Sequence, residues 1–173
     1  MKYVIAAVIA WLLAVVSVSA MPYIEVLGVT PDLVLIFAAC WAVVREPDEA
    51  FVVVPIAAFA KDLMSSDPVG TSVIAFIPIV LLAAAVRMRA LDSDFIPTIV
   101  VVATGTIAFE ALHMMVLAVT GQQIETGYAV LHVAIPGAVV NALFCPVIYL
   151  PVRWFTPRRP SVLYGGGRLT SPL

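Results

Sequence analysis

Six apolar segments follow one another along the chain, and short stretches that hold most of the charged and turn-forming residues separate them. These segments cover residues 4–21, 33–44, 50–64, 72–86, 95–120 and 128–152. They are apolar on every face, whereas the strands of a membrane barrel alternate apolar and polar residues. Helices satisfy their own backbone hydrogen bonds in lipid, so the pattern predicts six helices. The second, third and fourth segments are shorter than the roughly 20 residues of an ordinary span, and neighbouring helices would have to shelter them.

Composition adds that these helices belong to a membrane protein. Of the 173 residues, 63% are hydrophobic and 12% are charged, and the mean hydropathy is +1.11. A soluble domain of this size must keep a polar shell and has no room to bury so much apolar surface. We therefore expect an all-α integral membrane protein, with one six-helix domain over residues 1–152 and a short basic tail containing Pro and Gly over residues 153–173. A net charge of -2 without a basic stripe argues against nucleic-acid binding.

The positions of the basic residues predict the orientation. With the N-terminus in the cytoplasm, Lys61 is the one basic residue on the outer side, and eight lie on the inner side: Lys2, Arg45, Arg87, Arg89, Arg153, Arg158, Arg159 and Arg168. The positive-inside rule favours this arrangement, and six spans return the C-terminus to the cytoplasm. The first segment also resembles a secretory signal with a cleavage site near residue 20. Its apolar run is longer than a usual signal core, so we expect it to stay as the first helix.

The fifth segment carries two ionisable residues, Glu110 and His113, on one helix face. An ionisable group inside a membrane is a functional candidate by default. The Glu-x-x-His spacing also occurs in di-metal bundles, but those need a second copy and two further glutamates, so we expect no metal site. A buried polar cluster with His132 and Asn141 of the sixth segment is the preferred interpretation. A ligand pocket or a proton relay is the alternative.

Further charged residues gather at the outer ends of the second and third segments. Lys61 lies near Asp32, Asp62 and Asp67 in this arrangement. An ion pair of Lys61 with Asp32 or Asp62 would lock the two short helices together, and substrate binding is the alternative. The sequence from Asp67 to Gly70 reads as a turn before the fourth helix.

The first segment has alanine at every fourth position, at Ala6, Ala10 and Ala14. Small residues at this spacing form a ridge that allows another helix to approach closely. The ridge can contact either the protein's own bundle or a partner helix.

Motifs of known enzyme classes are missing from the sequence. There is no glycine-rich phosphate loop, no Gly-x-Ser-x-Gly elbow and no His-Glu-x-x-His. We therefore expect no catalytic residues, no cofactor and no enzymatic activity.

Two stretches resemble the MreD family of rod shape-determining membrane proteins. The first opens with Pro31 and Asp32 and continues to a segment that ends in Asp62, followed by a Ser- and Gly-containing turn up to Gly70. The second is residues 135–146, where a proline, an asparagine (Asn141) and a second proline match the last helix of that family. The chain departs from the family pattern at Lys61, where an apolar or small residue is usual, and in residues 55–60, which lack the usual glycines. Glu110 and His113 match no motif of the family.

The resemblance implies a non-catalytic subunit of the bacterial cell-elongation machinery in the inner membrane. Such proteins bind MreC, work with the actin-like MreB, and support RodA and a class B penicillin-binding protein in making lateral peptidoglycan. Membrane lipid is the remaining expected partner. The residues that the resemblance singles out, as structural or interface positions, are Asp32, Asp62, Gly70 and Asn141.

A second class has a similar architecture, namely the substrate-binding S components of energy-coupling-factor vitamin transporters. Those proteins also have six helices and dock a coupling subunit through small residues of the first helix, a role that would suit Ala6, Ala10 and Ala14. Their ligand site lies near the outer side, where we expect Glu110, His113 and His132. A vitamin pocket usually needs several convergent polar groups and longer outer loops than residues 121–127 offer.

Overall fold

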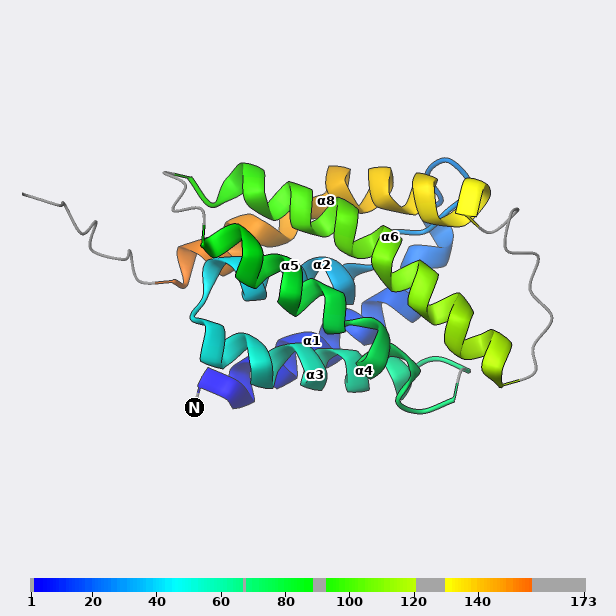
Figure 1. The fold of residues 1–173 in the computed structure, drawn as a ribbon, viewed down its shortest axis with the longest axis horizontal. Coiled ribbons are helices and arrows are strands. Elements are labelled where there is room, and N and C mark those ends of the chain that lie inside the picture. The colour runs from blue at the N-terminus through cyan, green and yellow to red at the C-terminus, as the bar shows by residue number, and fades with distance from the viewer. Residues whose placement is uncertain (1, 67, 89–92, 121–129, 157–173) are drawn as a thin grey trace, which may run out of the picture.

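The computed structural model describes residues 2–66, 68–88, 93–120 and 130–156, and over these residues the chain is helical with short connections (Figure 1). The elements are α1 (Lys2–Ser19), η1 (Met21–Tyr23), α2 (Leu33–Val44), α3 (Pro47–Asp62), α4 (Thr71–Ala75), α5 (Ile77–Arg87), α6 (Phe95–Val119), η2 (Val130–Ala134) and α8 (Ile135–Trp154). Three helical stretches are long and apolar enough to cross a membrane: Lys2–Ser19, Phe95–Val119 and Val130–Trp154. The prediction of an all-helical chain is confirmed for the described residues. Most of the tail, the segment 121–127, Asp67 and Arg89 lie outside them.

Two of the predicted segments are interrupted. The fourth is divided at Phe76 into α4 and α5, because Pro78 has no N–H to donate to the carbonyl group of Ile74 and a new helix starts at Ile77. The sixth begins with the π-helical turn η2 before α8 continues. The other predicted bounds agree with the structure to within a few residues.

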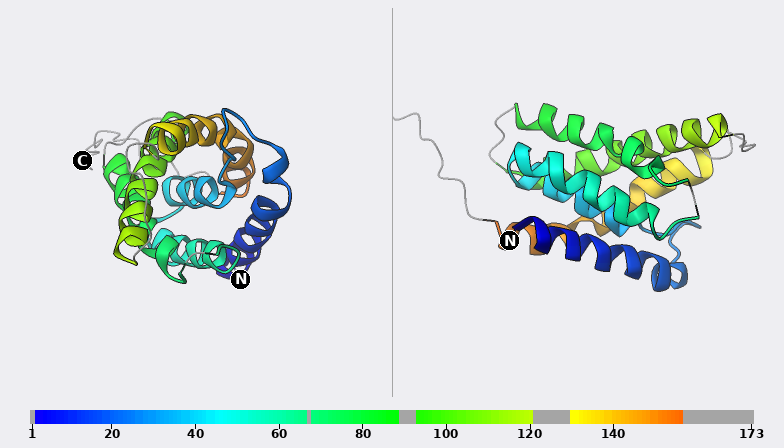
Figure 2. Two further views of the ribbon diagram at one scale, coloured as in Figure 1. Left: turned by 90° about the vertical axis from the view of Figure 1, so that its right-hand side faces the viewer. Right: turned by 90° about the horizontal axis from the view of Figure 1, so that it is seen from below.

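Helix α2 lies in the centre of the bundle. It packs against α1, α3, α5, α6 and α8, and Figure 2 shows these helices arranged as a ring around it. All 12 of its residues are buried. A helix that is apolar on every side belongs either in a protein core or in a membrane. The burial of all its residues shows that α2 forms the core around which the longer helices are arranged.

The alanine ridge of α1 lies inside this bundle. Ala6, Ala10 and Ala14 are at most 1% exposed, and α1 packs against α2 and α3. The small side chains allow this close approach, whereas the larger residues of α1, such as Val8 and Leu12, are exposed. The ridge therefore contacts the chain's own helices, which is one of the two arrangements that the sequence allows.

Ion pairs hold together the end of the bundle where α1 and α3 begin. Glu49 accepts from Lys2 at 2.8 Å and lies 3.3 Å from Arg45. Arg153 lies 3.9 Å from Asp94 at the start of α6. The structure describes five basic residues. One of them, Lys2, begins α1, and three others lie where α2, α5 and α8 end: Arg45, Arg87 and Arg153.

Candidate functional site

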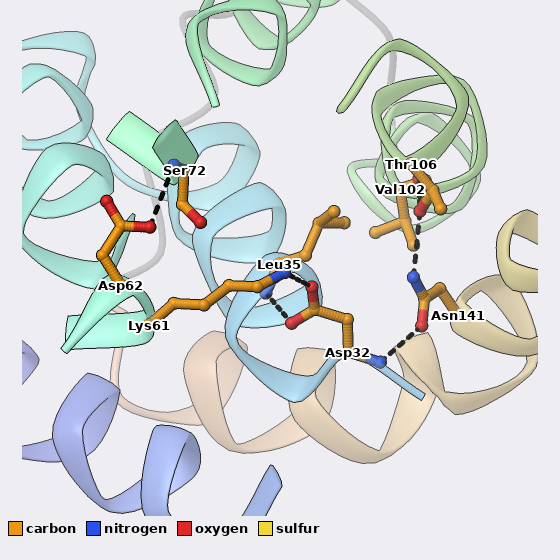
Figure 3. A network of polar contacts seen from close by, with 8 residues as sticks. All are labelled: Asp32, Leu35, Lys61, Asp62, Ser72, Val102, Thr106 and Asn141. Carbon is orange, nitrogen blue, oxygen red and sulfur yellow. Dashed lines mark hydrogen bonds and ion pairs between the residues drawn. The ribbon is translucent and has the colours of Figure 1, made fainter. Parts of the chain in front are cut away.

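Asp32 begins the central helix and connects it to two neighbours. One oxygen of its carboxylate accepts a hydrogen bond from the N–H of Leu35 at 3.0 Å, which caps the first turn of α2. The other oxygen forms an ion pair with Lys61 at the end of α3. The main-chain N–H of Asp32 donates to Oδ1 of Asn141 on α8 at 2.8 Å. One residue thus joins α2, α3 and α8 (Figure 3).

Asn141 links this point to α6. Its Nδ2 donates to Oγ1 of Thr106 at 3.0 Å, and that hydroxyl donates in turn to the carbonyl group of Val102 at 2.8 Å. Asn141 is 2% exposed, and both ends of its amide have partners. A buried amide with satisfied donors and acceptors stabilises a specific packing of helices.

The side chain of Lys61 extends toward Asp32 at the start of α2, as Figure 3 shows. Its ammonium group lies 4.0 Å from the centroid of the Phe109 ring, a cation–π contact that adds to the ion pair. Phe109 is about 21 Å along α6 from Phe95 and about 15 Å from Val119, at a rise of 1.5 Å per residue. The ion pair therefore lies near the middle of the longest helix and far from both of its ends.

Asp62, the next residue, organises a separate turn. Its carboxylate accepts from the N–H of Gly70 at 2.6 Å and from the N–H of Ser72 at 3.0 Å. Gly70 has a φ of +101°, a left-handed conformation that glycine adopts without strain. Asp62 is 1% exposed, so it is a structural residue that holds the connection from α3 to α4.

A cleft of about 450 Å³ lies beside the Asp32–Lys61 pair. We call it the central cleft; its walls come from α1, the connection to α2, and helices α3, α6 and α8. Its polar lining includes Ser17, Thr30, Asp32, Lys61, Glu110 and Asn141. This volume is within the range of small-molecule sites.

Of the three residues of the predicted buried polar cluster, Glu110 and His113 are half-buried and His132 is exposed. Glu110 lines the central cleft, while the ring of His113 packs against Phe109 with centroids 5.3 Å apart. His132 lies in the π-helical turn η2. The hydrogen bond that joins α8 to α6 leads from Asn141 to Thr106, one helical turn before Glu110.

Sequence reasoning missed Thr106 and Ser17. Thr106 lies four residues before Glu110 and therefore on the same face of α6, so the spacing could have revealed it. Nothing in the local sequence marks Ser17, which meets the cleft only through the packing of α1. Within the described ranges, no group of three or more His, Cys, Asp or Glu side chains is placed to hold a metal ion.

Comparisons of this chain with protein-family models, with curated proteins and with solved structures found no match.

Proposed function

We propose that this chain is a non-catalytic membrane subunit of the bacterial cell-elongation complex, as its resemblance to the MreD family implies. The observation that supports this proposal is that the four residues singled out by the resemblance form hydrogen bonds within the chain. Asp32 and Asn141 hydrogen-bond to each other, and Asp62 hydrogen-bonds to Gly70. These polar atoms hold the chain's own helices in place, as a scaffold requires.

The proposal includes insertion into the inner membrane with six spans and both termini in the cytoplasm. The clustering of Lys2, Arg45, Arg87 and Arg153 at the chain positions that would face the cytoplasm supports this orientation. Helices α2 and α3 are short for a bilayer, but α2 is enclosed by its neighbours and meets little or no lipid.

The partners that follow are MreC, MreB, RodA and a class B penicillin-binding protein. We would tag the protein in its native host, extract the membranes gently and identify co-purifying proteins by mass spectrometry. Enrichment of MreC and the wall synthases is the expected result. The variant Asp62→Ala should lose these partners because it removes the two hydrogen bonds that the Asp62 carboxylate accepts from Gly70 and Ser72. Asp48→Asn, at an exposed position of α3, is the matched control.

The second candidate is an S component of a vitamin transporter. The central cleft favours it, because its volume suits a small molecule. The burial of Ala6, Ala10 and Ala14 opposes it, because those residues would have to dock a coupling subunit. Co-purification of an ATP-hydrolysing pair with a coupling subunit, without MreC, would replace the first proposal with this one.

A further inference from the structure

The central cleft exists because the central helix starts deep inside the ring. Helix α2 has 12 residues and is about 18 Å long, whereas α6 has 25 residues and is about 37 Å long. The first turn of α2 is joined through Asn141 to Thr106, close to the middle of α6. The surrounding helices therefore continue well beyond the start of α2. The central cleft lies between them, next to the first turn of α2.

The charges that border the cleft do not balance. Its charged lining residues are Asp32, Lys61 and Glu110, two carboxylates and one ammonium group. The ammonium group of Lys61 is paired with Asp32, whose other oxygen bonds to Leu35. Among the residues that the structure describes, none forms a hydrogen bond with the carboxylate of Glu110. The Glu110 carboxyl group thus faces the cleft without a hydrogen-bonded partner, and the positive groups near it are Lys61, which Asp32 already pairs, and His113.

Glu110 lies about 22 Å along α6 from Phe95 and about 14 Å from Val119. A carboxylate at such depth in an apolar bundle is costly unless a positive group compensates it. We propose that the central cleft binds a small organic ammonium ion, with Glu110 as its counter-ion. This inference does not depend on membership of the cell-elongation complex.

Size and chemistry favour an organic ammonium ion over other ligands. A cleft of about 450 Å³ is much larger than an inorganic monovalent ion. An anion would have to displace Asp32 from Lys61 and would meet Glu110 as well. The hydroxyl groups of Ser17 and Thr30 border the same space, and the Ser17 hydroxyl is buried without a hydrogen-bond partner among the described residues. These hydroxyls offer acceptors that an N–H donor can use.

The test uses three probes of one shape that differ in charge: benzylamine, benzyl alcohol and benzoate. The full chain would be purified in dodecyl maltoside, a detergent without charged groups, and binding measured by ligand-observed NMR. We expect benzylamine to bind at least ten-fold more tightly than benzyl alcohol, and benzoate to bind most weakly.

The variant Glu110→Gln should remove this preference for the amine. Glu25→Gln is the matched control, because Glu25 is an exposed carboxylate in the α1–α2 connection and does not line the cleft. Circular dichroism of both variants would establish that they are folded. Equal binding of benzylamine to the wild type and Glu110→Gln overturns the proposal, as does stronger binding of benzoate or no binding of any probe.

The same ammonium group occurs in soluble amines and in ethanolamine phospholipids. Adding an ethanolamine phospholipid to the detergent micelles separates the two sources. Displacement of benzylamine by the lipid assigns the site to a lipid headgroup, whereas unchanged binding assigns it to a soluble amine. Either result supports an ammonium site, provided that it depends on Glu110.

Discussion

At the residue scale, the polar groups inside this apolar chain act mainly as connections between helices. Asn141 satisfies the N–H of Asp32 and donates to Thr106, so one amide joins three helices. In apolar surroundings, removing one partner of such a hydrogen bond destabilises the fold. The remaining donor or acceptor is then buried without a partner, and no water can replace the lost one. The burial of Asn141 therefore makes it a position of α8 that is sensitive to substitution.

Replacing Asn141 by leucine should lower the free energy of unfolding by about 1–2 kcal/mol, because the N–H of Asp32 loses its acceptor. Detergent-induced unfolding followed by circular dichroism measures this loss. Val139→Leu, at an exposed position of the same helix, should have almost no effect. Equal stability of the two variants would show that the amide contributes nothing to packing.

At the element scale, the short helix α2 depends on groups outside itself for its position. Asp32 caps its first turn and ties it to Lys61 of α3. Both side chains keep part of their surface exposed, 24% for Lys61 and 19% for Asp32, so the pair is less costly to desolvate than a fully buried one. The pair locks α2 to α3, and the cap lets the helix start inside the bundle.

The variant Lys61→Met should lower the free energy of unfolding by about 2 kcal/mol, less than the 3–5 kcal/mol typical of a fully buried pair, because it leaves Asp32 as an unpaired charge. Adding Asp32→Asn should restore most of the loss, since asparagine still caps a helix and carries no charge. Thermal unfolding of both variants in detergent shows which of the two is more stable. A double variant less stable than Lys61→Met alone would contradict this account of the pair.

At the scale of the whole molecule, the two ends differ in charge. One end holds four basic residues and the ion pairs of Glu49, while the other contains the α1–α2 connection and the α3–α4 connection. By the positive-inside rule, the end with the four basic residues is expected to face the cytoplasm. In the orientation that we propose, the α1–α2 connection lies outside and the α2–α3 connection lies in the cytoplasm.

Labelling of intact cells with a membrane-impermeant maleimide tests this orientation. Glu25→Cys should react from outside, whereas Glu46→Cys should react only after the membrane is opened; both positions are exposed. The native Cys40 and Cys145 are buried, so the unmodified chain is the control and should remain unlabelled. The reverse pattern would place the termini outside the cell.

The sequence alone determined the helical class, the bounds of most helices and the asymmetry of charge. These properties depend on local chemistry: apolar runs, proline positions and the hydrogen bonds that a helix makes within itself. The resemblance to the MreD family, which rests on short motifs of the sequence, also singles out Asp32, Asp62, Gly70 and Asn141.

Only the tertiary structure decided which of these residues meet. The hydrogen bond from Asp32 to Asn141 joins residues 109 positions apart, and the alanine ridge of α1 is buried by the chain's own helices. A helical pattern specifies which face is apolar, but it does not specify which other helix that face contacts. The enclosure of α2, the depth of the Asp32–Lys61 pair and the central cleft therefore follow from the packing of all the helices together.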